Sequence, residues 1–234
     1  MNFLKIKNFL LLFLIIFSYL ISVAKTYAVD ITADRTISSS SDGDQYNIKT
    51  NNDIDVIVTN NSTLERNQKI FNVSAASLTG SSITIHLGSS VIAETNSIFS
   101  NGAELTITNT GTIEATNSKA INVSNSDGVS ITNNNNGVIK SNNNTILGDA
   151  GTGADNVTID NSGEIYTTAT GTESSAIVFA NNDTGNTITN NSGGEIYSSG
   201  SESTIVLGVS STLTNSGSIK NNCLLYTSDA ADDP

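Results

Sequence analysis

Two glutamates stand at the same place in neighbouring copies of a repeated phrase. Glu164 lies in the string Gly-Glu-Ile at 163–165, and Glu195 lies in the same string at 194–196. If the copies stack one above the other, the carboxylates lie about 5 Å apart, close enough in principle for acid–base work. Neither is accompanied by Arg or His, and Lys140 stands two copies from Glu195. We therefore interpret both as solvated repeat positions and predict no catalytic residue.

Metal binding has equally isolated candidates. Residues 151–157 read Gly-Thr-Gly-Ala-Asp-Asn-Val, a loose match to the Gly-x-Gly-x-Asp of Ca²⁺-binding repeats. Those sites take ligands from tandem copies, and one copy is present here. Asp42-Gly43-Asp44 is also alone and indicates a turn. His86 lies in a predicted strand without Cys or carboxylate at metal-ligand spacing. We expect no metal site and no cofactor.

The elements that carry these residues are short strands that repeat. An alternating apolar strand ending in Asn is followed by Gly and a second short strand, in copies spaced about 23 to 31 residues apart. A third strand follows the first four copies, within 119–123, 145–147, 175–179 and 203–207, and no pattern of helical period intervenes. Such a repeat indicates a stacked architecture. The predicted fold is all-β, a right-handed parallel β-helix (solenoid) of about five or six coils over 83–222. The copies are 105–109 with 111–113, 129–133 with 137–139, 157–161 with 163–165, 187–190 with 194–196, and 213–215 with 217–219.

The repeat register predicts two inward files and a further column at the turn that ends the first strand. The first file of core residues is Ile107, Ile131, Ile159, Ile188 and Leu213, and the second is Ile113, Ile139, Ile165, Ile196 and Ile219. A column of amides ends the strands, at Asn109, Asn133, Asn161, Asn190 and Asn215. These Asn act either as turn formers alone or also as a continuous hydrogen-bonded ladder.

The alternation around the second file also predicts which side chains face outward. Glu114, Lys140, Tyr166, Tyr197 and Lys220 point out, and the small residues Ala115, Ser141, Thr167 and Ser198 point in. Tyr166 above Tyr197 forms either an aromatic stripe for contact with sugar or protein, or a pair that stabilises neighbouring strands.

Composition limits the partners. Charged residues make up 14% of the chain, and 10 Lys and Arg against 22 Asp and Glu give a net charge of −12. An acidic surface without a basic patch disfavours nucleic acid and anionic membranes as partners. The abundance of Asn, Ser, Thr and Gly is typical of an exported all-β protein.

The two ends differ from the repeats. Residues 1–28 resemble a secretory signal, with Lys5 and Lys7 ahead of an uncharged apolar run, and an uncleaved anchor is the alternative. Residues 29–82 are less regular and are interpreted as an N-terminal cap and first coil. The tail 223–234 begins at Cys223, the only Cys, and resembles the translation of a transposase-type sequencing adapter. A genuine short acidic tail is the alternative.

The signal, the Asn-Gly phrase and the Thr/Ser/Asn-rich strands resemble autotransporter passenger domains of Gram-negative bacteria. Adhesins of the filamentous-haemagglutinin kind are similar. The resemblance covers about 83–222 and is carried by Ile-Thr-Asn-Thr-Gly-Thr-Ile at 107–113 and its four variants. It implies a β-helix exposed at the cell surface or secreted, and anchored to the outer membrane through a C-terminal barrel that this sequence lacks.

Three functional hypotheses follow. The first is a non-catalytic adhesin or interaction scaffold that contacts a host or neighbouring-cell surface protein or glycan. The second is a fragment of a β-helical carbohydrate-active enzyme whose site lies in a missing part. The third is a passive surface stalk.

Overall fold

The computed structural model describes residues 28–49, 52–59, 61–74, 78–102, 104–148 and 153–222. The predicted signal peptide, apart from Ala28, and the predicted adapter-derived tail lie outside the described residues. Every regular element within these ranges is a β-strand. Within the described part of the chain, no helix has the length and the apolar character needed to span a bilayer.

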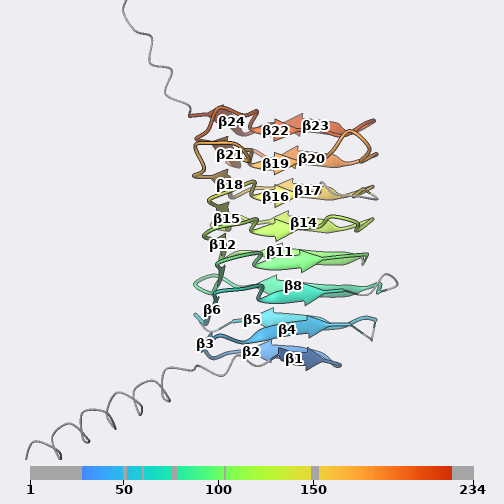
Figure 1. Ribbon diagram of the computed structural model, residues 1–234, viewed down its shortest axis with the longest axis vertical. Coiled ribbons are helices and arrows are strands. Elements are labelled where there is room, and N and C mark those ends of the chain that lie inside the picture. Colours follow the sequence, from blue (N-terminus) through green and yellow to red (C-terminus); the bar gives the residue numbers. More distant parts are fainter. Residues whose placement is uncertain are drawn as a thin grey trace, which may run out of the picture.

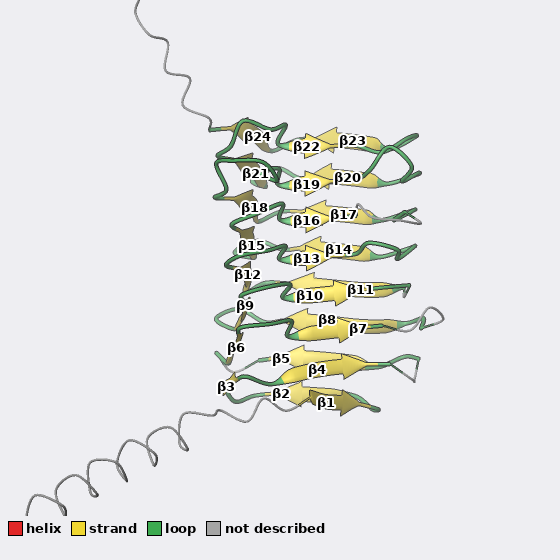
Figure 2. Ribbon diagram, in the orientation of Figure 1, coloured by secondary structure: helices red, strands yellow, loops and turns green. Residues whose placement is uncertain are grey.

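The strands form three parallel sheets of eight strands each, stacked along one axis (Figures 1 and 2). Each strand pairs with the strand three places further along the chain, so one strand from each sheet makes up a rung. Sheet A contains β1 (Ala28–Ile31), β4 (Gln45–Ile48), β7 (Phe71–Val73), β10 (Ile98–Ser100), β13 (Ile121–Asn122), β16 (Ile146–Leu147), β19 (Ile177–Val178) and β22 (Ile205–Val206).

The other two sheets follow the same order. Sheet B contains β2 (Arg35–Ile37), β5 (Asp55–Val58), β8 (Ser81–Ile85), β11 (Leu105–Asn109), β14 (Ser130–Asn133), β17 (Thr158–Asn161), β20 (Thr187–Asn190) and β23 (Thr212–Asn215). Sheet C contains β3 (Ser41–Asp42), β6 (Thr63–Arg66), β9 (Ser90–Ala93), β12 (Thr112–Ala115), β15 (Val138–Ser141), β18 (Glu164–Thr167), β21 (Glu195–Ser198) and β24 (Ser218–Asn221).

The predicted parallel β-helix is confirmed, with about seven turns rather than five or six. The additional turns come from 29–82, where a cap and first coil were expected. Strands β1 to β3 and β4 to β6 form complete rungs there. Val58 and Ile85 are paired in the same column as Asn109, so apolar residues occupy in these rungs the place that Asn takes later. The right-handed sense of the coil stays a prediction.

The core consists of inward-facing aliphatic files that run along the axis. Ile107, Ile131, Ile159 and Ile188 pair in register and are fully buried. Ile113, Ile139, Ile165 and Ile196 form the second buried file. Burying each such side chain contributes about 1.5–3 kcal/mol. Leu213 is 39% exposed and Ile219 partly buried, because both belong to the last described rung.

Candidate functional site

The amide column is a continuous hydrogen-bonded ladder inside the solenoid. The Nδ2 of Asn109 donates to the Oδ1 of Asn133 at 2.9 Å. The same bond joins Asn133 to Asn161, Asn161 to Asn190, and Asn190 to Asn215, each at 2.8 Å. The first four side chains are fully buried. Spacings of 24 to 29 residues between partners match the length of one coil.

The same amides close the turn between sheets B and C. Asn161 Nδ2 also donates to the carbonyl oxygens of Gly163, at 3.1 Å, and of Glu195 on the next rung, at 3.3 Å. A Cβ at Gly163 would lie 2.2 Å from the carbonyl oxygen of Gly137, so only glycine fits between rungs here. The ladder therefore combines the two roles that the sequence left open. Because it is buried, its role is structural.

The outer face of sheet C carries the chemically distinctive side chains. Five consecutive rungs place Glu114, Lys140, Tyr166, Tyr197 and Lys220 in one register. We call this the outer column. Lys140 Nζ lies 2.9 Å from Glu114 Oε2, and this hydrogen bond raises the pKa of Lys140. The Tyr166 and Tyr197 rings stack with centroids 4.5 Å apart and an angle of 7° between their planes. Burial, followed by the adjacent Tyr166, raises the pKa of Tyr197.

The Glu164–Glu195 pair lies beside the outer column. The two residues are direct partners in β18 and β21, as the repeat register predicts. Lys220 Nζ lies 3.8 Å from a Glu195 carboxylate oxygen, and both side chains are about half exposed. The pair lines a shallow groove of about 600 Å³ at the turn between sheets B and C. Exposed carboxylates in this setting suit contact with a polar partner.

A second depression lies on the other side of the outer column. It has a volume of about 300 Å³ and is lined by Glu114, Lys140, Tyr166, Asn142 and Thr168, among others. The lining combines an ion pair, a phenol ring, an amide and a hydroxyl. These are the groups that hydrogen-bond to sugar hydroxyls or to peptide groups, and the stacked rings offer apolar surface beside them.

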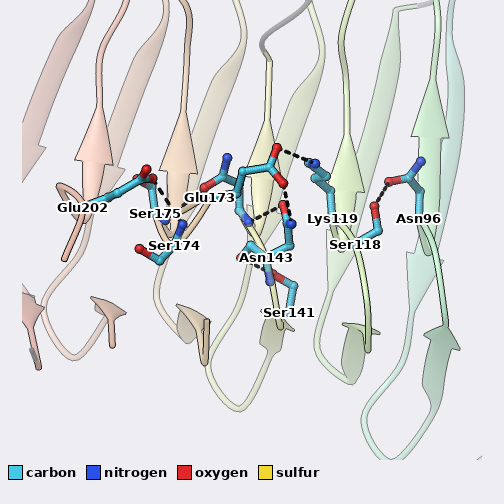
Figure 3. A network of polar contacts seen from close by, with 10 residues as sticks. Asn96, Ser118, Lys119, Ser141, Asn143, Glu173, Ser174, Ser175 and Glu202 are labelled. Carbon is cyan, nitrogen blue, oxygen red and sulfur yellow. Dashed lines mark hydrogen bonds and ion pairs between the residues drawn. The ribbon is translucent and has the colours of Figure 1, made fainter. Parts of the chain in front are cut away.

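The corner between sheets C and A carries a polar network across several rungs (Figure 3). Glu173 receives a hydrogen bond from Lys119 Nζ at 3.2 Å and one from Asn143 Nδ2 at 2.7 Å. These contacts, with that of Asn143 the larger, lower the pKa of Glu173. Ser174, the next residue along the chain, donates its backbone N–H to Glu202 Oε2 on the following rung at 3.2 Å. We call this the polar corner.

Sequence reasoning did not find the polar corner. Its members come from loops of unequal length, with 54 residues between Lys119 and Glu173. The strand register therefore does not extend into these loops, and no periodic signal marks their side chains. Only the alternation of the strands on either side shows that the loops must lie one above another.

The isolated motifs have structural roles where they are described. His86 Nδ1 lies 3.1 Å from Thr59 Oγ1 on the previous rung. Asp155 Oδ1 accepts a hydrogen bond from the Thr184 amide at 2.6 Å. The backbone of Asp42 in β3 is in register with that of Glu65 in β6 of sheet C. Residues 151–152 lie outside the described ranges. No group of three or more His, Cys, Asp or Glu side chains suited to a metal occurs among the residues that the structure describes.

Comparison with protein-family models, with curated proteins and with solved structures finds no match to this chain.

Proposed function

We propose that this chain belongs to an exported β-solenoid that acts at the cell surface or outside the cell as a non-catalytic interaction scaffold. Its resemblance to autotransporter passenger domains supports an adhesin role. The partner we propose is a protein or glycan on a host or neighbouring cell. The observation that carries this proposal is the outer column with its stacked tyrosines and the two depressions beside it.

The outer column is suited to binding because it is rigid and partly desolvated. Its strands are held by parallel pairing on both sides, so the Tyr166–Tyr197 stack loses little conformational freedom on contact with a partner. Aromatic side chains with a polar tip supply much of the energy at interfaces. Rungs repeat at about 4.8 Å, so one partner can contact several of them. Weak contacts of this kind gain strength when many copies are displayed on one surface.

The experiment is an adhesion assay with bacteria that display the full chain. The test variant is Tyr166→Ser combined with Tyr197→Ser, which leaves the strands in place. The matched control is Thr132→Ala combined with Thr189→Ala, on the outward face of sheet B. We expect the tyrosine variant to lose at least about fivefold in adhesion to a matrix-coated surface or to other cells, and the control to retain it.

The remaining hypotheses are distinguished by the same material. Adhesion unchanged by the tyrosine substitutions would refute the outer column as the contact surface. Absence of adhesion by the unaltered chain would favour the passive stalk. Turnover of a polysaccharide that disappears on Glu164→Gln or Glu195→Gln would favour the enzyme, which the in-register pair keeps as the second candidate.

A further inference from the structure

Two cations near the N-terminal end of the solenoid, Arg66 and Lys69, stand apart from the ion pairs. Arg66 ends β6 and pairs in register with Ala93, in an inward column that later rungs fill with small residues. Lys69 lies three residues further, at the corner between sheets C and A. Neither forms an ion pair within the described part of the chain. The ion pairs there are formed by other cations, namely Lys49, Lys119, Lys140 and Lys220.

Arg66 organises the carboxamides around it. Its side chain is 8% exposed, its NH1 donates to Gln45 Oε1 at 2.6 Å, and its NH2 donates to Gln68 Oε1 at 3.3 Å. Its Nε is buried and has no hydrogen-bond partner. Burial lowers the pKa of Arg66, with a smaller opposing effect of Asp44. Because Gln68 presents its oxygen to Arg66, its amide Nε2 is left as a donor. A buried guanidinium with an unused donor is costly to the fold unless charge or hydrogen bonds around it compensate.

The second cation lies at the surface of a depression beside these amides. The depression has a volume of about 410 Å³ and is lined by Gln45, Gln68, Lys69, Asn72 and Thr95. Lys69 Nζ lies 3.6 Å from the centroid of the Phe99 ring. Burial lowers the pKa of Lys69. The ammonium is thus partly desolvated, and no carboxylate lines the depression. Glu94, which precedes Thr95, accepts a hydrogen bond from Asn117 at 3.0 Å.

We propose that this depression binds an acidic saccharide unit, with the carboxylate of the sugar paired to Lys69 and its ring hydroxyls bonded to the surrounding amides and to Thr95. The lining supplies one ammonium together with carboxamide and hydroxyl groups, which matches a ligand carrying one charge among several hydroxyls. The chain as a whole carries a charge of −12. It therefore repels a densely charged polymer such as nucleic acid more strongly than a uronate polymer, whose charges are farther apart.

The inference deepens the proposed interaction function by naming a ligand class, and it uses residues distinct from the outer column. The test titrates the full chain by calorimetry with a galacturonic acid trimer and with a neutral galactose trimer. We expect binding of the uronate trimer only. Lys69→Gln should weaken it at least about tenfold, since a charge-assisted hydrogen bond is lost. Thr95→Val should weaken it about threefold, and circular dichroism should show both variants folded.

Lys49→Gln is the matched control, since it removes the same charge from an exposed lysine that pairs with Asp30 at 3.5 Å. Its affinity should remain within about twofold of the unaltered chain. No binding of the uronate trimer, equal binding of the neutral trimer, or equal losses for Lys69→Gln and Lys49→Gln would overturn the proposal. The Tyr166→Ser and Tyr197→Ser variant should bind the trimer normally, so failure of the outer column and failure of this site are separate results.

Discussion

Replacing Asn161 in the centre of the amide ladder tests whether the inner columns hold the coils together. Its Nδ2 donates to Asn190 Oδ1 at 2.8 Å, and its Oδ1 accepts from Asn133 at 2.8 Å. Asn161→Ala removes both contacts together with the bonds to two carbonyl groups. The bond from Asn133 contributes about 1 kcal/mol, and the buried Asn190 oxygen, which loses its ladder donor, adds a cost of about 1–3 kcal/mol. We expect a loss of about 2–4 kcal/mol in the free energy of unfolding.

The matched control for this substitution is Asn135→Ala, an exposed Asn in the turn that follows the ladder residue of the preceding rung. Its loss should be below about 0.5 kcal/mol. Urea unfolding followed by circular dichroism and by tyrosine fluorescence gives the midpoint and slope for each variant. Both probes are needed because repeat proteins can unfold in parts. Equal losses for Asn161→Ala and Asn135→Ala would refute the ladder as a stabilising element.

Asn161→Asp separates hydrogen bonding from shape. The carboxyl has the size of the amide, but it faces the oxygens of Asn190, Gly163 and Glu195, which accepted bonds from Nδ2. These acceptors disfavour its charged form and should raise its pKa in the folded state. The folded state then binds more protons than the unfolded state, so stability falls as pH rises. Relative to the unaltered chain at the same pH, the variant should be less stable at neutral pH than at mildly acidic pH. A difference that does not change with pH would refute this account.

Two further predictions concern the core and the polar corner. Ile165→Asp should abolish cooperative urea unfolding because it buries a carboxylate in a file of isoleucines. Tyr166→Ser should lower the free energy of unfolding by at most about 1 kcal/mol. Equal losses of stability would show that the inward and outward assignments are wrong. The pKa of Glu173 is lowered by Asn143 and Lys119, so its stabilisation is present above the ordinary carboxyl range and is lost as pH falls through its folded value. At neutral pH, thermal unfolding should show that Glu173→Gln has a free energy of unfolding lower than that of the unaltered chain by less than about 1 kcal/mol. At acidic pH the two free energies should be equal. A difference that grows as the pH falls would contradict the assignment.

The sequence allowed the rungs from residue 105 onward to be placed because one phrase carries several constraints at once. Asn ends the first strand, Gly makes the close approach between rungs, and Ile follows two residues after the Gly. Because each copy ends its first strand in Asn, Asn109 and Asn133 identify which residues of neighbouring rungs are paired. The period of two along a strand then determines whether each side chain points inward or outward.

The N-terminal rungs were underestimated because the same column changes residue type. Ile37, Val58 and Ile85 occupy the positions that Asn takes from Asn109 onward. All three are buried. In these rungs the turn between sheets B and C is stabilised by the burial of an apolar side chain instead of by amide hydrogen bonds. The sequence therefore shows no distinctive residue that marks the end of the strand. The polar corner and the depression at Lys69 were missed for a related reason, since Glu173 in the first and Gln68, Lys69 and Thr95 in the second lie in the loops between strands, where no periodic pattern marks them.

The separation between inner and outer columns has a consequence for function. Inner residues are buried between the rungs on either side, so a polar side chain placed there loses its contact with water. Outer residues such as Tyr166 and Lys140 contact mainly their column neighbours, and surface substitutions of this kind usually change stability by less than about 0.5 kcal/mol. The solenoid can therefore carry a cationic depression at its early rungs and an aromatic and acidic face at its later rungs without altering the core. This independence makes the two surfaces separately testable, because neither set of substitutions should unfold the other.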